Sequence, residues 1–156
     1  MIRMALAATL GAAVFVGATP TTAQDTSLSA NFGEIRLSAG FTPDPARREL
    51  TAGGGIDAYS ETDLPGSCVG KITAAPDFEV SYEAGSLPLV FRVRSNTDTT
   101  LIVNGPDGSW SCDDDSWGDG DPEVRFAKPR SGTYDIWVGT FGDATAPATL
   151  LITETP

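Results

Sequence analysis

Apolar and polar residues alternate with a period of two in several short segments of this chain, and no other feature constrains the fold as strongly. Residues 34–39 have the sequence Glu-Ile-Arg-Leu-Ser-Ala, and the same alternation recurs in residues 78–83, 89–94 and 123–126. A period of two places alternate side chains on opposite faces of a β-strand. Each of these segments is therefore predicted to be a strand with one buried face.

Other strands and the turns between them complete the pattern. Residues 99–103 form a continuous β-branched and apolar run. In residues 134–138, Tyr134, Ile136 and Val138 form a further set of side chains expected to point inward, and residues 150–153 form the last predicted strand. Turn formers such as glycine, proline, asparagine and aspartate fill the separators. About eight short strands without helical periodicity predict an all-β fold, an antiparallel β-sandwich or jelly roll.

The segment between residues 41 and 55 interrupts the strand pattern. Pro43 and Pro45 cannot donate hydrogen bonds to a sheet, and the three glycines at 53–55 form a second break. Between these two breaks, residues 46–50 are expected to form at most one helical turn.

The first 23 residues have the composition of a secretory signal peptide. Arg3 supplies the positive start, residues 4–17 are apolar or small, and residues 21–23 offer a cleavage site. The apolar stretch is about 14 residues, shorter than the roughly 20 that a membrane-spanning helix needs, although a retained anchor is the alternative. We expect a periplasmic or secreted protein without stable membrane insertion. The expected parts are a signal peptide at 1–23, a flexible lead-in at 24–32 and a β-sandwich domain at 33–156.

The net charge limits the partners of this chain. Ten Lys and Arg residues stand against 21 Asp and Glu residues, which gives −11 at pH 7. Nucleic acids and anionic membrane surfaces repel a domain of this charge. Cations, basic partners and neutral polymers remain as candidates, so we expect a protein or polysaccharide partner and no nucleic acid. The sequence leaves the oligomeric state open.

The two cysteines, Cys68 and Cys112, are predicted to form a disulfide bond. An exported chain with an even number of cysteines usually pairs them. A redox-active pair is the alternative, but the chain has no Cys-x-x-Cys motif. We therefore expect a structural bond.

The segment from Cys112 to Glu123 holds six carboxylates in twelve residues. Calcium takes six to eight oxygen ligands, and glycines let a chain wrap closely around the ion. The segment does not match the EF-hand pattern, because Trp117 and Val124 occupy ligand positions. It is predicted either to bind calcium or to form an acidic solvated turn. The candidate ligands are Asp113, Asp114, Asp115, Asp119, Asp121 and Glu123.

The three tryptophans are candidate ligand-binding residues. Trp110 and Trp117 flank the acidic segment, and Trp137 lies on the face of its strand opposite Ile136 and Val138. Exposed tryptophans can bind sugars or peptides through their rings. The alternative is that they cover the edge of the core or cap the disulfide.

The residues needed for the common hydrolytic mechanisms are missing. The chain contains no histidine, which excludes Ser-His-Asp and Cys-His systems and histidine-ligated zinc sites. No Gly-x-Ser-x-Gly elbow, phosphate-binding loop or dinucleotide motif is present. Two carboxylates could still hydrolyse a glycoside, but the acids here crowd into one loop. We expect no enzymatic activity and assign no catalytic residue.

The hairpin at 101–108, the acidic turn at 113–115 and the segments at 121–126, 129–139 and 148–153 follow in an order that resembles the bacterial pre-peptidase C-terminal domain. The resemblance covers about a third of the chain. It implies a jelly-roll fold, an extracytoplasmic role, and calcium at Asp113, Asp114, Asp115 and Asp121.

These features predict a non-catalytic exported binding or accessory module that docks a protein or polysaccharide, with calcium as the candidate cofactor. The alternative is a structural accessory subunit of a cell-envelope or secreted complex, whose open sheet edge pairs with another chain. A peptidase-associated hydrolase is the third hypothesis.

Overall fold

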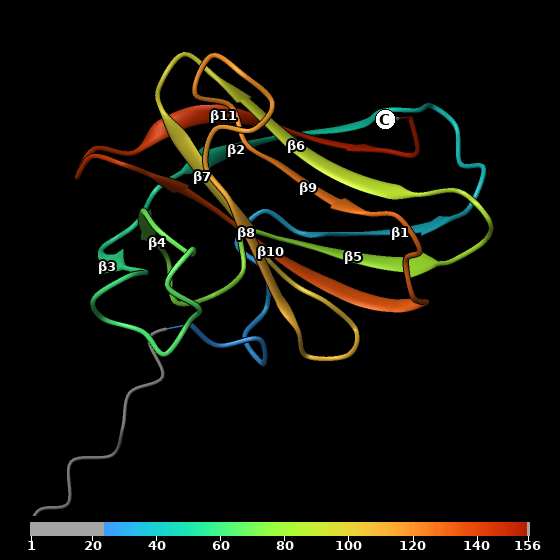
Figure 1. Ribbon diagram of the computed structural model, residues 1–156, viewed down its shortest axis with the longest axis horizontal. Coiled ribbons are helices and arrows are strands. Elements are labelled where there is room, and N and C mark those ends of the chain that lie inside the picture. Colours follow the sequence, from blue (N-terminus) through green and yellow to red (C-terminus); the bar gives the residue numbers. More distant parts are fainter. Residues whose placement is uncertain (1–23, 156) are drawn as a thin grey trace, which may run out of the picture.

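A computed structural model of the chain describes residues 24–155. The predicted signal peptide at 1–23 lies outside the described residues. The described part is all-β, and its eleven strands form two sheets (Figure 1). Residues 24–155 contain no helix that could cross a membrane.

The seven-stranded sheet is organised around β10 (Gly132–Thr140), the longest strand. The first half of β10 pairs antiparallel with β5 (Phe78–Glu83), and its second half pairs antiparallel with β7 (Thr99–Asn104) along the other edge. On the far side of β5 lies β1 (Glu34–Ser38), and β8 (Trp110–Asp113) pairs with β7. The strand β10 therefore connects almost every part of this sheet.

The four-stranded sheet has the order β2 (Ala46–Ala52), β11 (Ala146–Thr153), β6 (Leu89–Ser95) and β9 (Glu123–Phe126). All of its pairs are antiparallel. In Figure 1 it forms the upper layer, above β1, β5 and β10.

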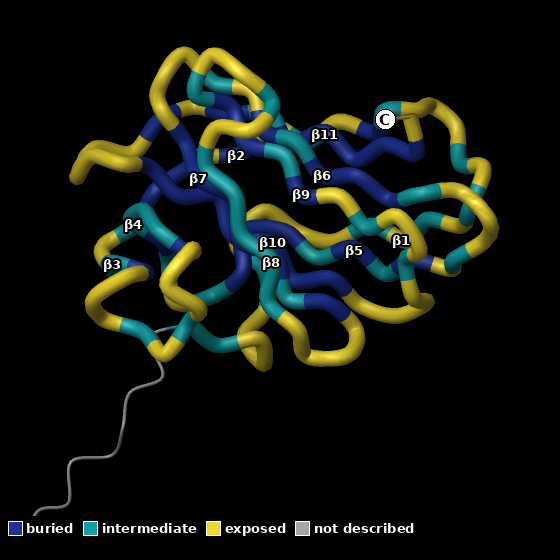
Figure 2. Tube along the Cα trace, viewed as in Figure 1, coloured by how far each residue is buried: buried dark blue, intermediate teal, exposed yellow. Residues whose placement is uncertain are grey.

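The main core lies between the two sheets. Alternate side chains of both sheets are buried there. Figure 2 shows that the buried residues, in dark blue, lie mostly along the strands, and that the connecting loops are mostly exposed. Phe91 from one sheet and Tyr134 from the other lie 5.6 Å apart between ring centroids, and Phe126 completes the aromatic cluster. The alternation predicted from the sequence is thus confirmed as the pattern that fills this core.

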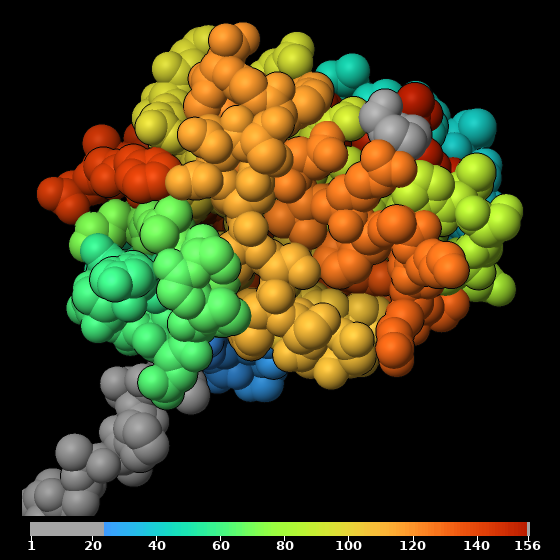
Figure 3. All heavy atoms as spheres, in the orientation of Figure 1, coloured from blue at the N-terminus to red at the C-terminus, as the bar shows by residue number. Residues whose placement is uncertain are grey.

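A second, smaller core covers the outer face of the seven-stranded sheet. The segment that contains β3 (Ile56–Asp57) and β4 (Lys71–Ile72), green in Figure 3, folds over β10 and β7 and buries Trp137 and Ile102. Its glycine at 54 has no room for a Cβ, which would lie 2.1 Å from the backbone of Ile72. The chain just before β3 can therefore lie this close to β4 only with glycine at this position.

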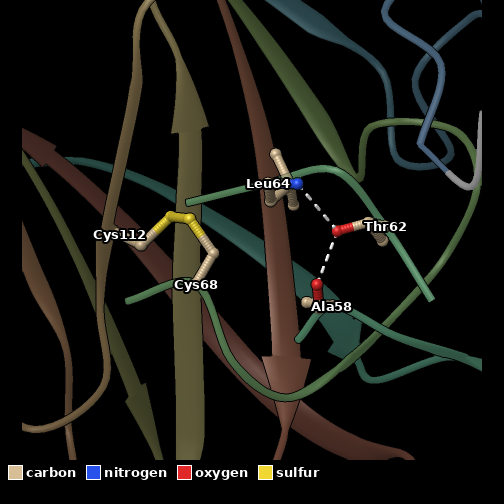
Figure 4. The surroundings of a disulfide bond; sticks show 5 residues. All are labelled: Ala58, Thr62, Leu64, Cys68 and Cys112. Carbon is tan, nitrogen blue, oxygen red and sulfur yellow. Dashed lines mark hydrogen bonds between the residues drawn. A yellow bond between two sulfur atoms is a disulfide. The ribbon is translucent and has the colours of Figure 1, made fainter. Parts of the chain in front are cut away.

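The predicted disulfide between Cys68 and Cys112 is confirmed, and it fastens this covering segment to β8. The two Cα atoms lie 5.1 Å apart, across a sequence separation of 44 residues. Figure 4 shows the adjoining turn, in which the Thr62 hydroxyl donates to the Ala58 carbonyl at 2.5 Å and accepts from the Leu64 N–H at 3.1 Å. The disulfide thus joins the covering segment to β8 within the second core.

Two expectations about the strands are wrong. Residues 46–50 do not form a helical turn, because β2 pairs with β11 over its whole length and points Ala46 and Leu50 into the core. The sheets are not antiparallel throughout either, since β1 runs parallel to β5. The reason is that residues 39–45 carry the chain from β1 to the other sheet instead of turning back as a hairpin. The jelly-roll order stays a prediction.

The lead-in before β1 lies against residues 74–77. The backbone N–H groups of Asp25, Asn31 and Phe32 each donate to a carbonyl of that segment at 2.8 Å. The flexibility expected for residues 24–32 stays a prediction.

Candidate functional site

Three loops from distant parts of the sequence meet at one end of the molecule. They are the β6–β7 loop (residues 96–98), the β8–β9 loop (114–122) and the β10–β11 loop (141–145), which we call the three-loop rim. The Thr99 N–H donates to the Gly120 carbonyl, and the Phe141 N–H donates to the Asp98 carbonyl, each at 3.4 Å. In Figure 1 the β6–β7 and β8–β9 loops lie side by side at the top, and the β10–β11 loop lies at the left.

The rim carries a concentration of negative charge. The carboxylates of Asp98, Asp115, Asp119 and Asp143 are on exposed residues, and Asp114 is half-buried. None of these five carboxylates forms an ion pair with another described residue. Their charges are therefore available to a partner or to solvent cations.

The other carboxylates of the acidic segment shape the β8–β9 loop. Asp113 Oδ2 accepts hydrogen bonds from the N–H of Ser116 at 3.0 Å, from its hydroxyl at 2.8 Å and from the N–H of Glu123 at 2.8 Å. This one side chain closes both ends of the loop. Replacing it would release the loop, not merely remove a charge.

Asp121 and Glu123 fasten the loop to β6. Asp121 Oδ1 accepts from the Ser95 N–H at 3.2 Å, and its other oxygen lies 3.9 Å from Arg94 Nε. Glu123 Oε2 lies 2.5 Å from Arg92 Nε. These two carboxylates are thus paired with donors of the sheet below.

The tip of this loop is a tight turn. Asp119 has a φ of 58° between two glycines, and the Trp117 N–H donates to the Asp121 carbonyl at 3.0 Å. A left-handed φ is tolerated by aspartate better than by most residues other than glycine. The turn places Asp119 at the exposed tip.

The six predicted calcium ligands do not converge. Within residues 24–155, no three carboxyl, cysteine or histidine side chains are grouped so that they could hold a metal ion. Asp113, Asp121 and Glu123 already accept hydrogen bonds or ion pairs. In this arrangement these three carboxylates would have to give up their present partners to bind calcium, and calcium binding stays a prediction.

Calcium should leave the melting temperature of the protein unchanged to within about 1 °C. A ligand stabilises a protein only if it binds the folded state more tightly than the unfolded state, and three of the six predicted ligands already accept hydrogen bonds or ion pairs in the folded loop. The measurement is thermal unfolding by circular dichroism in millimolar calcium and in excess chelator, with magnesium as the control. A calcium-specific rise of several degrees would show that the loop rearranges around the ion.

The three tryptophans do not share one surface. Trp137 is completely buried in the second core, and the half-buried Trp110 packs on it with 5.4 Å between ring centroids. Trp117 lies in the acidic loop, where the guanidinium groups of Arg92 and Arg94 stand 5.0 and 4.6 Å from its ring centroid. Ligand contact by an exposed Trp137 is therefore wrong, because the covering segment beside Cys68 buries it. Ligand binding by Trp110 and Trp117 stays a prediction.

Two buried carboxylates outside the acidic segment have perturbed acidity. Burial raises the pKa of Asp77 to about 6, against hydrogen bonds from the Val138 N–H, Asn31 and Thr73 that favour the charged form. Burial also raises the pKa of Asp135 to about 6, and the neighbouring Glu79 carboxylate adds to the effect. Asp77 links the lead-in to β10, whereas Asp135 accepts no hydrogen bond from another described residue.

Sequence reasoning missed Asp98, Phe141 and Asp143 as members of the rim. Each lies in an ordinary turn, and only the meeting of three loops brings them near the acidic segment. The one signal available in the sequence was a phenylalanine at position 141, because a turn of small and polar residues does not need an aromatic residue.

No protein-family model matches the sequence, and no curated protein matches it. Among solved structures, the chain is similar to PliG of Aeromonas hydrophila, a periplasmic lysozyme inhibitor of g-type lysozyme. The two chains are 14% identical, the TM-score is 0.38, and the match covers 78% of this chain and 96% of that one.

Proposed function

We propose that this chain is a non-catalytic exported binding module whose three-loop rim docks on a basic surface of a partner protein. The observation that carries the proposal is the gathering of five carboxylates, from three separate loops, without a cation paired to any of them among the described residues. Carboxylates gathered on neighbouring loops without cations beside them repel one another. A basic partner relieves this repulsion and is attracted from a distance by the same field.

The rim is held in shape before any partner arrives. Asp113 closes the β8–β9 loop, and Asp121 and Glu123 fasten it to β6. A surface that is already ordered loses less conformational entropy on binding. This supports docking by a preformed surface in preference to a loop that folds around its ligand.

Phe141 gives the rim an apolar contact. Its side chain is on a residue that is 51% exposed, next to Asp98 in the β6–β7 loop. Large aromatic residues at the centre of an interface contribute much of the binding energy, and charges around them contribute steering and specificity. An exposed aromatic residue beside Asp98 and two residues from Asp143 is a composition suited to docking on a basic protein.

A polysaccharide partner has weaker support. Sugar binding usually relies on exposed aromatic faces, and Trp137 is buried while Trp117 lies against two guanidinium groups. Membership of the pre-peptidase C-terminal family and export by a signal peptide remain part of the proposal. A hydrolytic role has no support from the rim, since a chain without histidine lacks the usual general base.

Neutralising the rim should slow association with the partner by about 10- to 100-fold at low salt. The rim variant is Asp115→Asn/Asp119→Asn/Asp143→Asn, which alters exposed carboxylates and keeps Asp113 in place. Residues 24–156 are immobilised, and basic proteins captured from the periplasm or medium of the source cells are identified and purified. Their association rates are then measured by surface plasmon resonance at several salt concentrations.

The matched control is Glu34→Gln/Asp63→Asn/Glu83→Gln, which removes the same charge from exposed residues elsewhere. The control should bind nearly as fast as the unchanged protein. Equal rates for the rim variant and the unchanged protein, or equal losses in both variants, would contradict docking at the rim.

An accessory subunit that pairs through a sheet edge is the second candidate function. One observation favours it: β1 and β2 are edge strands, and an apolar groove of about 360 Å³ lies between them, lined in part by Ile35, Leu37 and Phe41. An unpaired edge beside apolar side chains is a template for strand addition. Capture that survives in the rim variant but is lost on Leu37→Glu would favour this function.

A further inference from the structure

A pocket on the outer face of the four-stranded sheet gathers positive charge in a strongly acidic protein. Its volume is about 340 Å³, and its lining includes Arg47, Arg92, Arg94, Trp117, Leu151 and Thr153. Only ten of the 156 residues are Lys or Arg, against 21 Asp or Glu. Three of those ten therefore line one small pocket.

Strand register explains why these side chains meet. Arg47 of β2 is paired with Leu151 of β11, and Leu151 is paired with Arg92 of β6, so the three lie in one row across the sheet. Arg94 follows two residues after Arg92 and therefore shares its face. With strands about 4.8 Å apart, Arg47 and Arg92 stand roughly 10 Å apart on either side of an apolar floor.

Two of the arginines are fixed in position. Arg92 pairs with Glu123 and donates from Nη1 to the Thr155 carbonyl at 3.5 Å, and Arg94 Nε lies 3.9 Å from Asp121 Oδ2. The Trp117 ring lies against the guanidinium groups of both arginines. A guanidinium carries five N–H donors, so the N–H groups of each arginine that have no partner here remain available to a planar acceptor. The β8–β9 loop thus helps to hold the side chains of Arg92 and Arg94 in place, which favours the binding of an anion.

The third arginine provides charge that is not balanced. Arg47 is exposed and forms no ion pair with any residue from 24 to 155. Asp44, the acidic residue of the lining, accepts from the Glu154 N–H and the Thr155 hydroxyl at 3.3 Å each, which holds it against the C-terminal segment. The pocket therefore presents an arginine without a counter-ion beside two arginines with fixed orientation.

We propose that this pocket binds a small carboxylate ligand, with Arg47 and the remaining N–H groups of Arg92 and Arg94 as its donors and Leu151 beneath its apolar part. Arginine forks match the planar carboxylate with two parallel hydrogen bonds. A volume of this size accommodates a ligand of a few carbon atoms. This site does not depend on the proposed docking of the rim, because it selects the opposite charge.

The test is a titration of isotopically labelled protein, residues 24–156, with sodium succinate, followed by NMR through the indole N–H signal of Trp117. Sodium phosphate, sodium sulfate and sodium chloride at matched ionic strength are titrated in parallel. We expect a saturable shift with succinate and only a small linear drift with chloride. Arg47→Gln should weaken the succinate affinity by about tenfold or more.

The matched control is Arg125→Gln, which removes an exposed arginine from the neighbouring strand β9 outside the pocket. It should bind succinate as tightly as the unchanged protein, and the melting temperatures of both variants verify that they fold. Saturation by phosphate or sulfate but not by succinate would overturn the assignment to carboxylates. Absence of saturation with all three anions, or an equal loss in both variants, would overturn the site itself.

Discussion

Replacing Cys68 and Cys112 by alanine should lower the free energy of unfolding by about 4 kcal/mol. In the chain-entropy model, a bond across this loop removes that much conformational freedom from the unfolded chain. The loop length follows from the sequence separation of 44 residues between the two cysteines. The measurement is equilibrium unfolding in urea, in which the midpoint should fall while the slope changes little.

The loss of the bond should also have a local effect that distinguishes it from general destabilisation. The covering segment buries Trp137, and the disulfide fastens that segment to β8. Without the bond, Trp137 should become accessible to an aqueous quencher such as iodide under native conditions. Tyr59→Ala, which changes a 68% exposed residue of the same segment, is the control and should leave both stability and quenching nearly unchanged.

Unchanged stability of the double cysteine variant would mean that the second core holds the segment without the bond. Reduction of the unchanged protein with dithiothreitol should reproduce the variant, since both remove the same cross-link. Different results from the two would show that the alanine substitutions act through packing.

Replacing Asp135 by asparagine should stabilise the protein at neutral pH by about 3 kcal/mol. Burial and the Glu79 carboxylate raise the pKa of Asp135 from 3.8 to about 6. Each unit of pKa shift corresponds to about 1.4 kcal/mol between the folded and unfolded states. Asparagine has nearly the same shape without the charge, and Asp135 accepts no hydrogen bond from another described residue that the change would break.

The direction of the pH dependence follows from the raised pKa. A carboxyl group that binds its proton more tightly in the folded state stabilises the fold below pH 3.8, and this contribution is lost as the pH rises through about 6. The variant should therefore equal the unchanged protein near pH 3 and exceed it increasingly up to pH 7. The measurement is urea unfolding at pH values across this interval.

Glu34→Gln is the matched control, because Glu34 is paired with Glu79 in the same row of the sheet but is exposed. It should change stability by less than about 0.5 kcal/mol. Part of the pH dependence should remain in the Asp135→Asn variant, since burial also raises the pKa of Asp77 to about 6. A gain that is the same at pH 3 and pH 7 would contradict the role of the charge.

The rim and the arginine pocket give the molecule two surfaces of opposite charge that share one loop. The β8–β9 loop presents Asp115 and Asp119 on the rim and lays Trp117 over Arg92 and Arg94. Glu123, at the end of this loop, is the ion-pair partner of Arg92. A change in the loop therefore acts on both surfaces, which is why the rim variant leaves Trp117 and Glu123 intact.

The strands and the covalent link were accessible from the sequence. Residues 78–83 and 89–94 alternate because one face of each meets the core, and the pairing of Cys68 with Cys112 follows from their number in the chain. Residues 46–50 were predicted wrongly because local propensity is weak in Ala-Arg-Arg-Glu-Leu, and the decisive contacts come from β11, about a hundred residues later.

The acidic segment shows where sequence reasoning ends for the candidate site. Its composition indicated a charged loop, and the structure contains that loop. Composition could not separate Asp113, which closes the loop, from Asp119, which stands at its exposed tip. The burial of Trp137 was also beyond reach, because the segment that covers it lies more than 60 residues earlier in the chain.

The sequence by itself determined the all-β class, the core-facing side of alternating strands such as 78–83 and 89–94, and the excess of negative charge, because these depend on residue type and local spacing. The tertiary structure alone decided which loops meet at the rim, which carboxylates are engaged, and which arginines share a pocket. These depend on strand order and register, and a shift of one residue in register reverses the face of every side chain in a strand. The two proposed sites therefore depend on pairings between residues that are far apart in the chain.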